Sequence, residues 1–553
     1  MVDKTRGYEK RWIGLGFLGI SLLMIALDNT VLNLALPSIA NDLGASASEL
    51  QWIVDAYVLV FAALLLTMGS IGDRIGRKKM LQAGLVVFVI CSLLAALSTS
   101  TEMLIASRAL MGIGGAIVLP ATLSILTATF RDPRERGRAI ALWAATFALG
   151  AGIGPLVGGW LIEHFSWSAV FYINLPVAAV GLIGGYYFLM ESRDESPARV
   201  DLPGVLLSIA GLFALVYGII EAGADGWSAV NVLYSFGAAV VLLSAFAWWE
   251  RRCPNAMLPL RFFKNMSFTG SSLALTLVMF AMFGSMFFIS QYFQSVQGYT
   301  PLQAGVRLLP MALASFVAAA MSARVAELIG TKLTVALGIL VSAGGLFYLS
   351  QVAEVDTSYL VIVGGICITA LGMGTTMSPS TNSIMGSLPV RKAGVGSAMN
   401  DTTRQVGGAL GVAVLGAVMN STYVAGIDTM QAKVHLPEQL FEAVRGSVQG
   451  AHIAAQSITD PTVAKTVVDT ANEAFTSGMV DATIVAAAIM AVAVMVTLAI
   501  LPARIRGPQE EVLPAAAPDV PEVAVAEEVV SSERTKADRF SGDGPRGMGN
   551  GKQ

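Results

Sequence analysis

The sequence contains fourteen separate apolar stretches of roughly 18–25 residues, the length that an α-helix needs to cross a bilayer. Only 13% of the residues are charged, whereas soluble domains have about 25%. Inside a bilayer the backbone must satisfy its own hydrogen bonds, and a helix does so within one segment. The sequence therefore predicts an all-α polytopic membrane protein with helices near 12–36, 51–71, 80–98, 103–127, 138–162, 168–190, 202–222, 231–249, 267–293, 302–324, 333–351, 358–380, 395–420 and 480–502.

The loop charges predict the orientation of these helices. Loops after even-numbered stretches carry bases, such as Arg77 and Lys78, whereas loops after odd-numbered stretches carry acids, such as Asp42. By the positive-inside rule both termini are cytoplasmic, including residues 1–11. The first stretch is too long for the apolar core of a signal peptide, so we expect a retained helix.

Two regions outside these stretches have their own character. Residues 423–479 lie between the last two stretches, and Pro437 and Pro461 each stand near the start of an amphipathic run. We expect an extracellular helical hairpin there. Residues 507–553 are rich in Ala, Pro, Glu, Val and Gly without periodicity, which predicts a disordered cytoplasmic tail.

A weak internal repeat organises the helices. The run Asp73-Arg74-Ile75-Gly76-Arg77-Lys78 and the run Glu327-Leu328-Ile329-Gly330-Thr331-Lys332 share an acid, a glycine and a base in one register. Superposing 12–190 on 267–502 aligns them and leaves 202–249 as an inserted pair. Two six-helix halves are a common plan of secondary transporters.

The first stretch carries a carboxylate, Asp28, where an ionised group costs at least ~2.5–3.5 kcal/mol at the bilayer centre. Arg108 lies within 103–127. Counting ~1.5 Å per residue from the opposite sides on which their helices enter places both charges in the outer half. We expect a charge relationship, direct or through water; the alternative is that Arg108 snorkels to the outer surface. Asn33, near Asp28, is a candidate pocket residue.

Two further acids are candidate proton-coupling or substrate groups. Asp55 lies about one turn into 51–71, and its alternative is an interfacial carboxylate in contact with outside water. Asp401 lies in the inner half of 395–420, and its alternative is a local i,i+3 pair with Arg404.

Two glycine-containing segments are candidates for conformational gating. The tight loop after 51–71 allows a sharp helix–loop–helix turn, or it is a plain positive-inside loop. Around 150–159, small residues permit close helix approach and a proline kink, or simply ordinary packing. The residues concerned are Gly69, Asp73, Arg74, Gly76 and Arg77 in the loop, and Gly154, Pro155, Gly158 and Gly159 in the helix.

Adaptable side chains in 267–293 are candidates for a pocket wall, because Met and aromatic residues tolerate varied shapes. They are Met282, Phe283, Met286 and Phe287, and plain helix packing is the alternative.

Catalytic and metal chemistry find no support in the sequence. The three cysteines and three histidines are scattered, without metal-ligand spacing. Gly14 to Gly19 matches a dinucleotide fingerprint only as a string, because no strand precedes it. No Walker lysine loop is present, which argues against ATP as the energy source. We expect no enzyme activity and no cofactor, with protons as the coupling ion.

Together these signatures resemble the major facilitator superfamily, and within it the fourteen-helix drug:proton antiporters of the Qac/Emr type. The resemblance covers about residues 10–503. The segment 150–159 looks like the signature that separates exporters from importers. The other stretches that carry the resemblance are Asp28 to Pro37, Gly69 to Lys79, the Arg108 segment, and Trp167 to Pro176.

The resemblance implies roles for individual residues. Asp28 would be the proton- or cation-coupling carboxylate, and Arg108 would tune its proton affinity. Asp73 would lock its loop against the start of 395–420, near Gly394–Ser397, when the site faces outward.

The match is fuller at Asp55 than at Asp401. Asp55 stands where quaternary-ammonium exporters also have an acid. Asp401 matches only in part, because those exporters have more acids along this helix, whereas Arg404 adds positive charge here.

The expected function is a proton-coupled efflux antiporter that exports amphipathic, mainly cationic drugs, dyes or antiseptics by alternating access. Its partners would be small hydrophobic cations and the lipid bilayer of the cell (inner) membrane, with no nucleic acid, and it would act as a monomer. One alternative keeps the fold and exports an endogenous lipid, siderophore or antibiotic. Another is a non-transporting receptor or scaffold, against which the intramembrane charges argue.

Overall fold

The computed structural model describes residues 10–130, 132–193, 201–253, 260–387 and 393–502. The predicted tail at 507–553 and most of the predicted N-terminal segment lie outside these residues. The described part is almost entirely helical and contains no strand. Fourteen of its helices are long and apolar enough to cross a membrane, which is the predicted number.

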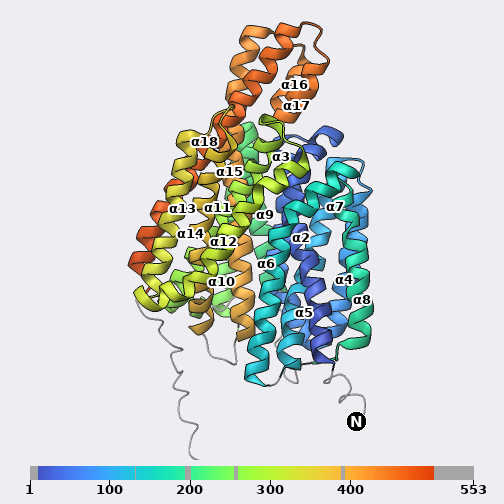
Figure 1. The fold of residues 1–553 in the computed structure, drawn as a ribbon, viewed down its shortest axis with the longest axis vertical. Coiled ribbons are helices and arrows are strands. Elements are labelled where there is room, and N and C mark those ends of the chain that lie inside the picture. Colours follow the sequence, from blue (N-terminus) through green and yellow to red (C-terminus); the bar gives the residue numbers. More distant parts are fainter. Residues whose placement is uncertain (1–9, 131, 194–200, 254–259, 388–392, 503–553) are drawn as a thin grey trace, which may run out of the picture. The chain divides into compact units, whose positions relative to one another are not determined.

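The helices form two halves and an inserted pair (Figure 1). The first half comprises α2 (Arg11–Leu43), α3 (Ala47–Ile75), α4 (Arg77–Ala96), α5 (Thr101–Thr129), α6 (Pro133–His164), α7 (Ala169–Tyr172) and α8 (Asn174–Phe188). The inserted pair is α9 (Leu202–Asp225) and α10 (Val230–Arg252), and the turn η1 (Leu260–Lys264) follows it. The second half comprises α11 (Met266–Gln291), the π-helical turn η2 (Tyr292–Val296), α12 (Pro301–Ile329), α13 (Thr331–Val352), α14 (Tyr359–Gly386), α15 (Ala393–Val434) and α18 (Pro461–Ile500).

The two halves repeat one packing scheme. In the first, α2 packs on α6 and α8, while α3 and α4 pack on α5. In the second, α11 packs on α15 and α18, while α12 and α13 pack on α14. The predicted pairing of helices, first half over second half, is therefore the observed one.

Local signals in the repeat explain why equivalent helices start and stop alike. Both α3 and α12 begin with a capping box, Ser46 with Glu49 and Thr300 with Gln303, which satisfies free N–H groups of the first turn. Both end at a glycine with positive φ, +125° at Gly76 and +84° at Gly330. Residues with a side chain rarely adopt a positive φ, so glycine is favoured at these two points, where the chain reverses direction.

Each half contacts the other through specific helix pairs. The cross-half pairs are α3 with α15, α6 with α12, and α2 with α11. Helix α9 packs against both α3 and α15, one helix from each half, and α10 packs on α9. Most of α10 is exposed, as expected for a helix that faces lipid.

The helix boundaries differ from the sequence prediction in two places. In the 423–479 segment, where the sequence predicts a helical hairpin, α16 (Glu438–Gly446) and α17 (Val448–Gln456) pack against each other; α15 continues to Val434 before them, and α18 already begins at Pro461 after them. The 168–190 stretch is broken at Ile173. Pro176 explains the break, since it cannot donate to the carbonyl four residues earlier. We call the end of the bundle that carries α16 and α17 the hairpin end, and the opposite end, with Arg77 and Lys78, the basic end.

Helix α6 approaches α2 very closely through glycines spaced four residues apart. A Cβ on Gly150 would lie 2.7 Å from the Ala26 Cβ, and one on Gly158 would lie 2.6 Å from the Val31 Cγ1. Gly154 faces Thr30 with even less room. Another face of α6, with Pro155 and Gly159, meets α12 of the second half. Small residues on two faces thus let α6 pack against both halves.

This packing makes Gly158→Ala and Gly152→Ala a matched pair. Gly158→Ala places a methyl 3.2 Å from the Val31 Cα, and we expect overpacking to cost about 1–3 kcal/mol. At Gly152 the nearest atom to a new Cβ is the Ala312 Cβ at 3.7 Å, an ordinary contact. Gly152→Ala should therefore keep the wild-type melting temperature in detergent. Equal melting temperatures for the two variants would contradict this account of the α2–α6 contact.

Candidate functional site

The central feature of the first half is a buried ion pair. Arg108 Nη1 of α5 lies 2.7 Å from Asp28 Oδ2 of α2, and the two side chains are 1% and 2% exposed. Arg108 Nε donates to the Ile53 carbonyl at 3.2 Å, and the guanidinium stacks on the Tyr57 ring at 4.3 Å. The predicted charge relationship is thus a direct contact. The snorkelling alternative for Arg108 is wrong, because the side chain turns inward to a carboxylate, a carbonyl and an aromatic face.

Glycines on α5 create this geometry. A Cβ on Gly112 would lie 2.6 Å from the Tyr57 carbonyl oxygen, and one on Gly115 would lie 2.7 Å from the Phe61 ring. Without side chains at these positions, the α3 backbone comes close enough for Arg108 to reach Ile53 and Tyr57. The glycines that follow Arg108 in the sequence therefore allow its side chain to contact α3 as well as Asp28.

Asp55 of α3 is fully buried, and neither carboxylate oxygen has a hydrogen-bond partner among the described residues. The interfacial alternative for Asp55 is therefore wrong in this arrangement. Gln51, one turn earlier, is also fully buried, and its amide is likewise unpartnered within the described part of the chain. Gly416 of α15 covers it, since a Cβ there would lie 2.7 Å from Gln51 Cδ. An ionised carboxylate is costly in such a site, so the geometry suits a protonated carboxyl.

Asp401 of α15 lies in a looser environment. Its Oδ1 is 3.9 Å from Arg404 Nη1 and accepts a 3.4 Å hydrogen bond from Asn400. The Asp401 and Arg404 side chains are 16% and 26% exposed. The local i,i+3 pair that the sequence allows is thus present, but it is longer than a hydrogen bond. Arg404 also reaches the Phe147 ring of α6, 5.7 Å away in the other half.

The loop around Gly76, at the basic end, forms hydrogen bonds within the first half. Asp73 accepts a 2.7 Å hydrogen bond from Arg77 Nε, and Arg77 Nη1 donates to the Ser124 carbonyl of α5 at 3.4 Å. Gly69 packs beside α5, and Arg74 is exposed. The side chains of 394–397, which Asp73 would lock against, lie outside the described residues, so that role stays a prediction.

Another ion pair joins α2 to α6 at the basic end. Arg11 donates to both oxygens of Glu135, at 3.1 and 2.8 Å. These hydrogen bonds lower the pKa of the half-buried Glu135 carboxyl.

The two halves are hydrogen-bonded to each other at the hairpin end. Ser290 Oγ of α11 donates to the Asn33 carbonyl at 2.6 Å, and Gln294 Nε2 donates to the Leu34 carbonyl at 3.0 Å. Glu163 at the end of α6 accepts from Thr300 Oγ1 at 2.8 Å, at the start of α12. Sequence reasoning missed these residues. Ser290 and Gln294 do carry a signal, because they are polar and one turn apart at the end of an apolar stretch.

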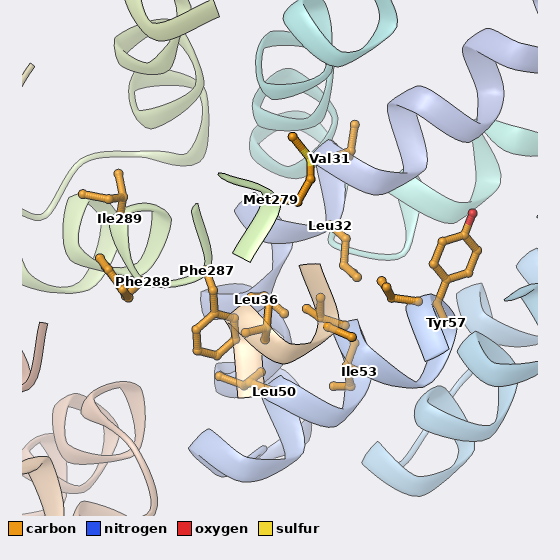
Figure 2. Close-up of a cluster of buried hydrophobic side chains, with 14 of the residues drawn as sticks. Val31, Leu32, Leu36, Leu50, Ile53, Tyr57, Met279, Phe287, Phe288 and Ile289 are labelled. Atoms are coloured by element: carbon orange, nitrogen blue, oxygen red, sulfur yellow. The ribbon is translucent and has the colours of Figure 1, made fainter. Parts of the chain in front are cut away.

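An apolar cluster lies beside these hydrogen bonds. Figure 2 shows Phe287 of α11 next to Leu36 of α2 and Leu50 of α3, and all three are fully buried. Phe287 therefore packs between the halves and lines no open pocket here. The other pocket candidates are Met282, Phe283 and Met286, which are half-buried, and Asn33, whose buried side chain bonds back to the Asn29 carbonyl at 3.4 Å.

A match to the Major Facilitator Superfamily spans residues 18–412. The chain belongs to this superfamily. It is 36% identical to the multidrug efflux pump LfrA of Mycolicibacterium smegmatis, over 89% of this chain and 96% of that protein. It is 32% identical to the tetracenomycin C resistance and export protein of Streptomyces glaucescens, over 88% and 91%.

The fold comparison agrees with this assignment. A bacterial homologue of the human lysosomal transporter Spinster, in an inward-facing and unoccupied conformation, superposes with a TM-score of 0.61 at 17% identity, covering 89% of this chain and 98% of that one. Family and relatives are transporters, and the protein is accordingly a multi-pass membrane transporter. The described residues contain no group of three or more His, Cys, Asp or Glu that could hold a metal ion.

The buried ion pair predicts strong coupling between Asp28 and Arg108. Removing one partner of a buried pair costs about 3–5 kcal/mol, because it leaves a charge without compensation. We expect Arg108→Gln to lower the melting temperature most. Asp28→Asn should lower it less, since its amide oxygen still accepts from Arg108. The double variant should recover part of the loss; additive losses in a double-mutant cycle would argue against the pair.

For the Asp55→Asn variant we expect no loss of thermal stability, in contrast to Arg108→Gln. Within the described residues the Asp55 carboxyl forms no ion pair, so Asp55→Asn should remove none, and it keeps the side-chain shape. We expect a melting temperature at or slightly above that of the wild type at neutral pH. A loss as large as that of Arg108→Gln would show that Asp55 has an ionic partner.

Proposed function

We propose that this transporter is a proton-coupled multidrug efflux antiporter that exports amphipathic, mainly cationic drugs, dyes or antiseptics by alternating access. The observation that carries the proposal is the sealed Asp28–Arg108 pair inside the first half. The similarity to LfrA, a multidrug efflux pump, supports drugs as the cargo.

The pair is suited to couple a proton to a conformational change. As long as Asp28 is ionised, Arg108 holds it at 2.7 Å and bridges α2, α5 and the α3 backbone. A proton on Asp28 would remove the attraction and release Arg108, which loosens these three helices. Asp55, buried where α15 covers α3, would hold a second proton whose presence favours contact between the halves. Protons are the coupling ion, and no other cofactor enters the cycle.

The proposed orientation places both termini in the cytoplasm of a cell (inner) membrane protein, with the hairpin end outside, following the positive-inside rule. The hydrogen bonds of Ser290, Gln294 and Glu163 would then close the outer side, which corresponds to an inward-facing arrangement. The transport path would run between the two halves of a single chain, so the proposed unit is a monomer that needs no partner but lipid and cargo.

A second candidate is export of an endogenous antibiotic or a related secondary metabolite. The observation that favours it is the similarity to the tetracenomycin C resistance and export protein over 88% of this chain. Metabolite profiling of a deletion strain separates the two, because only this candidate predicts that a compound accumulates in cells that have met no drug.

The proposed function predicts that Asp28→Asn uncouples transport from protons. In proteoliposomes with an imposed pH gradient, wild-type protein should accumulate a monocationic dye such as ethidium. Asp28→Asn should lose at least about 90% of this pH-driven transport, yet still exchange dye across the membrane without a gradient, because the neutral amide carries no proton.

The exchange assay is the control for folding of the variant. Undiminished pH-driven accumulation by Asp28→Asn would refute the assignment of Asp28. Absence of any dye-linked proton movement by the wild type would refute the antiporter itself and favour a receptor or scaffold.

A further inference from the structure

Arg404 is an intramembrane arginine whose donors have no hydrogen-bond partner in the described part of the chain. Its guanidinium makes no hydrogen bond to any described residue; its charged neighbour is Asp401 at 3.9 Å and its aromatic neighbour is Phe147 at 5.7 Å. A guanidinium has five N–H donors, and an arginine within a membrane protein normally has them paired. Arg108 shows the normal case, with a carboxylate, a carbonyl and an aromatic face around a 1% exposed side chain.

The place of Arg404 lies between the two halves. Helix α15 packs on α11, α18, α3 and α9, whereas α6 packs on α2 and α12. Arg404 reaches across from α15 to Phe147 on α6. Its side chain is 26% exposed and Asp401 beside it is 16% exposed, whereas Asp28, Arg108 and Asp55 are all sealed. Among these five intramembrane charges, Asp401 and Arg404 are the pair whose side chains are partly exposed.

The charges of this accessible pair cancel. A cargo with one cationic amine can approach Asp401, but a second positive charge on the same molecule meets Arg404. A carboxylate meets instead a guanidinium fork whose N–H donors bond no described residue, which is the geometry that Arg offers to carboxylates.

We propose that Arg404 is a specificity-determining residue that binds a carboxylate of the cargo. The preferred cargo class is then an aromatic zwitterion with one cationic group and one carboxylate, and dications are disfavoured. This inference rests on the proposed function only for movement of the cargo, because binding is measured separately.

A matched pair of dyes tests the proposal. Rhodamine 110 carries a cationic xanthene and a free carboxylate, and rhodamine 123 is its methyl ester, so the two differ in the group assigned to Arg404. Binding to purified full-length protein in detergent is measured by fluorescence polarisation. We expect Arg404→Gln to weaken rhodamine 110 binding by about tenfold or more and rhodamine 123 binding by less than about twofold, because a hydrogen bond to a charged group is lost for one dye alone.

Two further variants complete the design. Arg404→Lys keeps the charge without the fork and should retain part of the rhodamine 110 affinity. Arg307→Gln is the matched arginine control, because Arg307 stacks on Tyr299 at 3.9 Å and lies near the start of α12, away from the Asp401–Arg404 pair. It should leave the ratio of the two dye affinities unchanged. The dication propidium should bind Arg404→Gln more tightly than wild type.

Equal weakening of both rhodamines by Arg404→Gln would overturn the proposal and assign Arg404 a structural role. Failure of the proposed function looks different: wild-type protein would bind the dyes with the predicted dependence on Arg404, yet show no pH-driven accumulation of rhodamine 123 in proteoliposomes.

Discussion

The structure depends on how closely helices can approach one another inside lipid. Between membrane helices the hydrophobic effect gives little attraction, so close contact requires residues without bulk. Gly112 and Gly115 on α5 bring the α3 backbone within reach of Arg108. Only then does the guanidinium find the Ile53 carbonyl, the Tyr57 ring and the Asp28 carboxylate together. The buried charge pair is stabilised because the guanidinium makes all three contacts. The glycines permit the close helix approach that these contacts require.

The two halves use one backbone plan for different chemistry. Equivalent helices share capping boxes and positive-φ glycines, and equivalent pairs pack together. The intramembrane charges do not follow the repeat. In the first half Asp28, Arg108 and Asp55 are sealed, whereas in the second Asp401 and Arg404 are partly exposed. The second half thus holds its intramembrane charges in a less enclosed setting than the first.

The sequence predicts those parts of the structure that depend on position along a single helix. Helix number, the repeat and the Asp28–Arg108 contact follow from length, motif register and depth. The surroundings of Asp55 do not, because Gly416, distant in the chain, closes over its neighbour Gln51. The continuity of α15 and α18 beyond their apolar stretches was not predicted, for another reason. Hydropathy stops at the membrane surface, whereas helical hydrogen bonding continues through polar residues to Val434 and from Pro461.

Helix α9 makes different kinds of contact with the two halves. On the α15 side, Gly223 lies against the Ala417 backbone and its carbonyl accepts a 3.2 Å hydrogen bond from Asn420. On the α3 side the contact is made by side chains, with Trp52 beside Phe213 at 5.3 Å and hydrogen-bonded to Glu221. The inserted pair is therefore joined to the second half by a backbone contact and a hydrogen bond, and to the first half by contacts between side chains.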